Sequence, residues 1–258
     1  MKTDTKAELL ALIAARSAMR PVELARAVQI SPQALHRQLK ALVAQGALVV
    51  QGRPPRTFYA LAGVPDFSAA FAWISAQTIK ISPTNTVCET RDVFAGRLSP
   101  LKVLTRQGLD RDDLPQFISV VGEIGNNSFD HNLGQWRDVP GCWFETQVTG
   151  NKLWVCIGDR GQGIYSSLSK IDPGIADAQA AMQIAFEKFV SGRAPEKRGN
   201  GLKYVKNVIL DEVERGIACV SDRGRVRYGD WGHICDQLLQ ENTPIVRGTL
   251  TLMVWILK

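Results

Sequence analysis

Four polar residues recur at four-residue intervals in one segment of the chain: Ser119, Glu123, Asn127 and His131. In a helix this spacing puts all four side chains on one face. A glutamate carboxylate can orient or deprotonate a nucleophile, and an asparagine amide oxygen can ligate Mg²⁺. Together they suit chemistry on a phosphate ester. A solvated polar face explains the same row equally well.

A second group of chemically useful residues follows a predicted strand that begins at Lys152 and continues as an apolar run. The strand ends in the pattern Asp159-x-Gly161-x-Gly163. A carboxylate at a strand end can accept a hydrogen bond from an exocyclic amine. Glycines allow the backbone to approach a flat base closely. An ordinary loop turn would also produce this pattern.

The third group is basic and glycine-rich and consists of Lys197, Arg198, Gly199, Gly201 and Leu202. It leads into a helix predicted over 203–214. Glycines before a helix present backbone N–H groups that bind phosphate. A simple helix entry is the alternative.

The order of these groups is more specific than any one of them. Glu-x-x-x-Asn is followed after about 30 residues by Asp-x-Gly-x-Gly, and after about 40 more by Gly-x-Gly-Leu. This order resembles the ATP-binding fold of gyrase, chaperones, histidine kinases and mismatch-repair ATPases, the GHKL superfamily. A last strand from Gly248-Thr249 to Ile256 matches that family's final motif. The resemblance covers 85–258 and implies a two-layer α/β sandwich of the Bergerat type, with ATP and Mg²⁺ between helices and a mixed sheet.

The resemblance also implies roles for single residues. Glu123 would be the general base, Asn127 would hold Mg²⁺, and Asp159 would read adenine N6 with help from Thr249. Residues 165–198 would form a lid over the nucleotide. The other implied nucleotide contacts are Gly161, Gly163, Lys197, Arg198, Gly199, Gly201 and Leu202, with Lys188 and Arg193 of the lid available for phosphates.

Within the superfamily, the histidines argue against a histidine kinase. None of His36, His131 and His233 has the Glu/Arg/Pro-Leu neighbourhood of a phosphoacceptor. The first and third motifs instead resemble the anti-sigma-factor serine kinases, dimeric ATP domains that phosphorylate a small antagonist protein. The chain departs from those kinases in its N-terminal segment and in a basic hairpin predicted over 221–228. The arginines of this hairpin either form an extra nucleic-acid contact or are simply solvated charges.

The first quarter of the chain predicts a different module. Apolar spacing indicates helices over 6–15, 21–28 and 32–45, and a hairpin follows over 48–61. Ser31 before Pro32 is a typical helix start. This order resembles the winged helix-turn-helix of bacterial transcription regulators.

In that motif the third helix enters the major groove and the wing contacts the backbone or minor groove. The residues so placed are Ser31, Gln33, His36, Arg37 and Lys40 on the helix and Arg53 and Arg56 at the wing tip. Glutamine can bridge adenine, arginine can bridge guanine, and lysine can hold a phosphate. A protein-docking module with solvated charges is the alternative.

The charge distribution favours double-stranded DNA as the partner of this segment. Residues 1–63 hold nine Lys or Arg and three acidic residues, which is the whole net charge of +6. The remaining 195 residues hold 22 basic and 22 acidic side chains. A basic segment on a neutral body indicates a polyanionic partner.

The sequence therefore predicts an α+β protein with a winged helix-turn-helix at 1–63, a linker or connecting helix at 64–84, and an ATP-binding domain at 85–258. The run Leu250–Leu257 is far too short to span a bilayer, and the N-terminus has no cleavable signal pattern. The five cysteines, Cys88, Cys142, Cys156, Cys219 and Cys235, form no CxxC motif. They are expected to be reduced core thiols of a cytoplasmic protein.

Two functions remain open from the sequence. In the first, the protein is an ATP-binding, DNA-binding transcriptional regulator, in which Mg-ATP modulates the winged helix. In the second, it is an anti-sigma-type serine/threonine kinase or slow ATPase that acts on a small partner protein. We favour the regulator and expect a homodimer in which the lid orders over ATP and changes the separation of the two winged helices.

Overall fold

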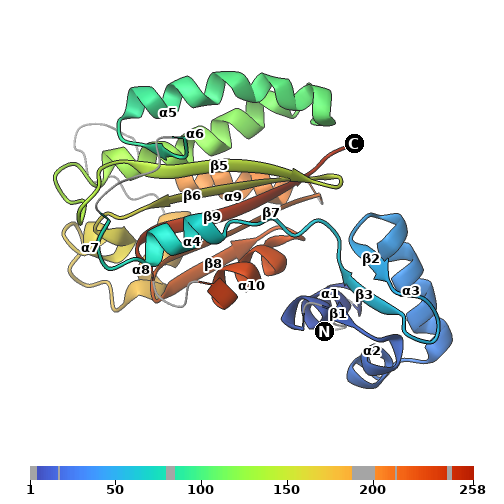
Figure 1. Cartoon of the computed structure of the whole chain (residues 1–258). Coiled ribbons are helices and arrows are strands. Elements are labelled where there is room, and N and C mark those ends of the chain that lie inside the picture. Colours follow the sequence, from blue (N-terminus) through green and yellow to red (C-terminus); the bar gives the residue numbers. More distant parts are fainter. Residues whose placement is uncertain (1–4, 17, 80–84, 188–200, 213, 243–245) are drawn as a thin grey trace. The chain divides into compact units, whose positions relative to one another are not determined.

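The computed structural model describes residues 5–16, 18–79, 85–187, 201–212, 214–242 and 246–258 (Figure 1). The fold is α+β, and the strand pairings whose register is defined are antiparallel. Contacts divide the chain into two units. Unit 1 consists of 1–65 with 148–152, and unit 2 consists of 66–147 with 153–258.

Unit 1 follows the order of elements expected from the sequence. Its elements are α1 Thr5–Ala15, β1 Ala18–Met19, α2 Pro21–Val28, α3 Pro32–Ala44, β2 Leu48–Gln51 and β3 Phe58–Leu61. The strand order is β1-β3-β2. The sequence did not predict β1, because its two residues are too few to show an alternating pattern. Helix α3 begins as expected, with the Ser31 hydroxyl accepting a hydrogen bond from the Ala34 amide at 3.2 Å.

The other sheet has six strands in the order β4-β5-β6-β9-β7-β8. The strands are β4 Val87–Cys88, β5 Cys142–Thr149, β6 Lys152–Asp159, β7 Arg215–Asp222, β8 Gly224–Tyr228 and β9 Val246–Ile256. In the antiparallel pair of β7 and β9, Ser221 lies opposite Thr249. The strand predicted to end at Asp159 and the basic hairpin predicted over 221–228 are both confirmed.

Helices surround this sheet. They are α4 Ser68–Ser75, α5 Arg91–Leu98, the 3-10 helix η1 Ser99–Gln107, α6 Leu114–Asp130, α7 Gly163–Leu168, α8 Ala178–Glu187, α9 Gly201–Asp211 and α10 Gly232–Asn242. Unit 2 begins at Asp66 and therefore includes α4.

Both faces of the sheet are covered by helices, which differs from the predicted two-layer sandwich. On one face Phe117 and Val121 of α6 share a core with Val155 of β6. Side chains alternate along a strand, so Gly158 faces the other way, where a Cβ would lie 3.3 Å from Ile74 of α4. All eight residues of β6 are buried, so neither face of the strand could be left to water.

The start of α6 differs from what its local sequence pattern predicts. Asp113 and Gln116 have the spacing of a capping box, but the Asp113 side chain makes no capping hydrogen bond. Its carboxylate instead accepts a hydrogen bond from Arg215 at 2.7 Å. The long-range ion pair replaces the local cap, and Asp113 itself has helical backbone angles.

The segment expected to form a lid is partly described, and that part is packed. Leu168 of α7 and Ala181 of α8 share one apolar cluster, and Met182 and Phe186 share another with the strand residue Cys219. Residues 188–200, which include Lys188 and Arg193, lie outside the described residues.

The five cysteines are free and buried, as expected for core thiols. Within the described residues, no helix is long and apolar enough to cross a membrane.

Candidate functional site

Asp159 ends strand β6 and lies almost fully buried, with 4% of its surface exposed. Its Oδ1 accepts hydrogen bonds from the Gly161 amide and from Asn132 Nδ2, both at 2.9 Å. Its Oδ2 accepts a longer one, of 3.5 Å, from the Ser128 hydroxyl. The backbone of Thr249 also donates to this carboxylate. An ionised carboxylate offers about four acceptor positions, and these four donors already contact this one, with the bond from Ser128 the longest of those measured.

Burial raises the pKa of Asp159 to about 7, although its hydrogen-bond donors act in the opposite direction. Desolvation of the charged form is the larger effect. A buried carboxylate with a raised pKa, held where several motifs meet, is typical of a functional group. A ligand amine that donates to this group would favour its ionised form.

The raised pKa predicts a pH-dependent cost in stability. An acid with a raised folded pKa stabilises the fold fully below its unfolded pKa, near 3.8, and loses that contribution as the pH rises to about 7. Asp159→Asn removes the titration. The free energy of unfolding of this variant, relative to wild type, should therefore rise between pH 4 and pH 7.5 by up to ~4 kcal/mol, at ~1.4 kcal/mol per pKa unit. Urea denaturation of both proteins across this range measures the difference, and a constant difference would contradict the raised pKa.

Asn132 is a site residue that the sequence did not reveal. It lies two residues after the last residue of α6 and is 4% exposed. Its Nδ2 donates to the Ser128 carbonyl at 3.0 Å as well as to Asp159, and its Oδ1 accepts from the Gln162 amide at 3.1 Å. One amide group thus joins the end of α6 to the loop after β6. A single asparagine after a helix carries no sequence signal for that role.

Three glycines around Asp159 serve a role that the sequence did not indicate. A Cβ on Gly161 would lie 2.0 Å from the Asn132 side chain, and one on Gly248 would lie 2.0 Å from the Asp159 carbonyl. Gly163 has a φ of +81°, and its Cβ would meet the Arg247 carbonyl at 2.8 Å. These glycines are needed because the protein packs tightly on itself around Asp159.

Ser221 is a second site residue missed by the sequence. It is 1% exposed; its hydroxyl accepts from the Ile164 amide at 2.9 Å and donates to the Gly248 carbonyl at 2.8 Å. Because Thr249 lies opposite Ser221 on the neighbouring strand, the start of α7 and the Gly248-Thr249 motif are held together.

The first and third motifs also meet. A Cβ on Gly201 would lie only 2.3 Å from Glu123 Oε2, so the start of α9 touches the polar row of α6. Glu123 and Asn127 are both partly buried, and neither side chain has a hydrogen-bond partner among the described residues. Leu202 packs against the apolar cores beside the site. A ligand could therefore engage both polar groups.

Part of the predicted site is not described. Lys197, Arg198 and Gly199 lie outside the described residues. In the basic hairpin, Arg225 and Arg227 both form ion pairs with Asp236, at 3.2 and 3.6 Å. Part of the positive charge of the hairpin is thus paired within the protein.

The predicted DNA-contact residues of unit 1 are all exposed. Ser31, Gln33, His36, Arg37 and Lys40 are all exposed on α3. The opposite side of α3 buries Leu35, Leu39 and Leu42. Arg53 and Arg56 are exposed in the turn between β2 and β3.

No protein-family model matches the chain, and no curated protein matches it. Groups of three or more His, Cys, Asp or Glu that could hold a metal are also absent from the described part of the chain.

Proposed function

We propose that this protein is an ATP-binding, DNA-binding transcriptional regulator, in which Mg-ATP held in unit 2 modulates DNA binding by unit 1. The observation that carries the proposal is the convergence of four separated motifs. Asp159 bonds to Ser128 of α6 and to Thr249 of β9, and Glu123 of α6 touches Gly201 of α9. This convergence and a helix-covered antiparallel sheet support an ATP-binding fold of the Bergerat type.

The Asp159 end of the site suits adenine. The hydrogen bond from Ser128 to its Oδ2 is long, at 3.5 Å, so the exocyclic N6 amine would replace Ser128 as a donor to that oxygen. Asn132 and Gly161 hold the carboxylate in one orientation through Oδ1. The carboxylate is thus preorganised, and a purine amine would find its acceptor already in place.

The Glu123 end of the site suits the phosphates. Asn127 would supply an amide oxygen to Mg²⁺, an ion that keeps several waters and takes its other ligands from phosphates. Glu123 would hold or accept a proton from a water or hydroxyl near Gly201. The absence of a dedicated carboxylate cluster in the described residues is compatible with an ion held mainly by nucleotide and water.

Unit 1 supports the DNA-binding half of the proposal. The order α1-β1-α2-α3-β2-β3 and the three-stranded sheet support the winged helix that the sequence resembles. The exposed face of α3 and the exposed turn between β2 and β3 carry the basic residues that this fold uses on DNA. ATP and DNA as ligands would place the protein in the cytoplasm, and two half-sites would call for a homodimer.

Two arginine variants test the DNA-binding half. Arg37→Ala should relax sequence preference, because a side chain on the recognition helix reads base edges. Arg53→Ala should weaken binding to all sequences alike and reduce the salt slope by about one, because a wing residue meets phosphate. Fluorescence anisotropy with genomic fragments at several salt concentrations measures both. Glu8→Ala is the control on α1. If wild type binds no fragment at low salt, the module docks a protein instead.

Glu123 keeps a second function open, that of a serine/threonine kinase or slow ATPase acting on a small partner protein. Its partly buried carboxylate has no hydrogen-bond partner among the described residues and lies beside Gly201. A carboxylate of this kind is suited to accept a proton from a nucleophile. The regulator remains our proposal because the net positive charge resides in the segment that resembles a DNA-binding module.

A further inference from the structure

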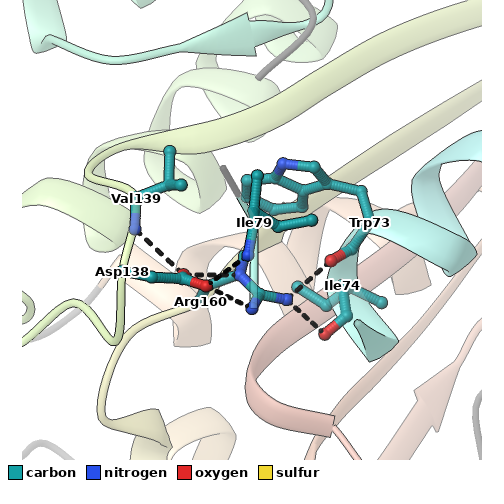
Figure 2. Close-up of polar contacts among 6 residues, drawn as sticks. All are labelled: Trp73, Ile74, Ile79, Asp138, Val139 and Arg160. Carbon is teal, nitrogen blue, oxygen red and sulfur yellow. Dashed lines mark hydrogen bonds and ion pairs between the residues drawn. The ribbon is translucent and has the colours of Figure 1, made fainter. Parts of the chain in front are cut away.

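Arg160 lies in sequence between Asp159 and Gly161, and the Gly161 amide donates a hydrogen bond to the Asp159 carboxylate. The Arg160 side chain is 2% exposed. Its Nε and Nη2 donate to the two oxygens of Asp138, at 2.8 and 2.7 Å (Figure 2). Its Nη1 donates to the carbonyls of Trp73 and Ile74, at 2.6 and 3.1 Å. One guanidinium therefore binds a carboxylate and the last turn of α4 at once.

Asp138 extends this set of contacts to a third segment. Its carboxylate also accepts hydrogen bonds from the amides of Ile79 at 2.8 Å and Val139 at 2.9 Å. The hydrogen bonds from Arg160 are the largest of several effects that lower the pKa of Asp138 to about 2, so the Asp138 carboxylate is ionised at neutral pH. The chain around α4, the 138–139 turn and the 159–161 loop are joined by these two side chains (Figure 2).

Loss of the contacts that Arg160 makes with Asp138 and α4 would destabilise the folded protein. The last carbonyls of a helix have no partner within the helix, and Arg160 supplies one for two of them in α4. A buried ion pair that loses one member leaves an uncompensated charge. Consequently, the position of the Asp159–Gly161 loop and the order of the end of α4 are expected to depend on each other.

We propose that Arg160 is a positioning residue for the nucleotide site, and that it couples occupancy of Asp159 to the order of residues 66–79. This rests on the proposed binding of ATP. A ligand that fixes the loop would restrict local opening of the segment bound to Arg160 and Asp138. The first part of unit 1 ends at Pro65, and α4 begins three residues later. Residues 66–79 are therefore the segment through which the chain leaves this part of unit 1.

The chain contains a matched control. Arg215 is also 2% exposed, bonds to Asp113 at 2.7 Å, and donates to the carbonyl of Val208 in α9 at 2.8 Å. It also lies over a tryptophan ring, as Arg160 does, at 4.3 Å from Trp255. Neither member of this pair adjoins Asp159 in sequence. Asp113→Asn should thus lower stability much as Asp138→Asn does, without acting on the site.

Hydrogen exchange of the full chain with and without ATP-Mg²⁺ tests the proposal, with ATP affinity measured by calorimetry on the same samples. In wild type, saturating ATP should slow exchange in the peptide 66–79, which includes the Ile79 amide. The expected slowing is ~5–100-fold, the upper value being that for complete coupling at 100 times the Kd. Asp138→Asn should bind ATP but lose this slowing, whereas Asp113→Asn should keep it.

The outcomes separate the two proposals. Wild type that binds ATP with unchanged exchange in 66–79 overturns the role of Arg160 and leaves the proposed function intact. Retained slowing in Asp138→Asn overturns it as well. If wild type binds no ATP, the proposed function fails and this inference fails with it. Should Asp138→Asn not fold, Arg160→Lys replaces it, because one ammonium cannot satisfy both carbonyls and both carboxylate oxygens.

Discussion

Replacing Glu123 by Gln should leave ATP binding nearly unchanged and lower any ATP turnover by about 10²–10⁴-fold, the usual contribution of a general base. The amide is the same size as the carboxylate and keeps the contact with Gly201, but it cannot accept a proton. Turnover is measured as phosphate release under saturating ATP-Mg²⁺. The loss should therefore fall on kcat and not on affinity.

The control for Glu123 is Ser119→Ala, one turn earlier on the same face of α6 and exposed. This variant should turn over ATP like wild type. Equal turnover in Glu123→Gln would show that Glu123 is a structural polar residue. Absence of turnover in all three proteins would favour a protein that only senses ATP.

Asp159→Ala should weaken ATP binding by ~1–3 kcal/mol, which is about 5–150-fold in Kd. The variant removes the buried acceptor proposed to read the adenine amine. It also leaves the Asn132 amide and the Gly161 backbone N–H without their shared acceptor. Calorimetric titration measures the change, and thermal melting of the same sample verifies that the variant is folded.

The control for Asp159 is Asp211→Ala, an exposed carboxylate at the end of α9. It should bind ATP with wild-type affinity. An unchanged affinity in Asp159→Ala would mean that Asp159 holds the loop through Asn132 without contacting a ligand, and the nucleotide site would have to lie elsewhere.

Local sequence patterns were sufficient to predict the helices and strands that carry the motifs. Ser31-Pro32 predicted the start of α3, and the apolar spacing of Leu35 and Leu39 predicted its buried side. The apolar run before Asp159 predicted β6 and its end. These features depend on residues close in sequence, so a pattern of helix caps and side-chain periods captures them.

Contacts between distant residues could not be predicted in this way. Asn132 and Ser221 act through partners 27 or more residues away, and Arg160 pairs with a residue 22 positions earlier. The capping-box spacing of Asp113 and Gln116 produces no cap, because Arg215, 102 residues later, binds the Asp113 carboxylate. In each case the decisive partner is chosen by tertiary packing.

The helices on the second face of the sheet, by contrast, could have been predicted from the sequence. A strand covered on one face alternates apolar and polar residues, whereas Leu153–Ile157 is apolar throughout. That run indicates burial on both faces, and α4 provides cover at Gly158. The expected two-layer arrangement came from the family resemblance and not from this run.

The most direct test of the central claim is the affinity of the full chain for DNA with and without ATP-Mg²⁺. Fluorescence anisotropy on a fragment selected from genomic DNA is suitable, with ATP affinity measured in parallel with and without that fragment. Coupling between the two units predicts a change of about 5–150-fold in each affinity, equal in both because coupling between two sites is reciprocal. Identical DNA affinities with and without bound ATP would contradict it, and would show that the two units act independently.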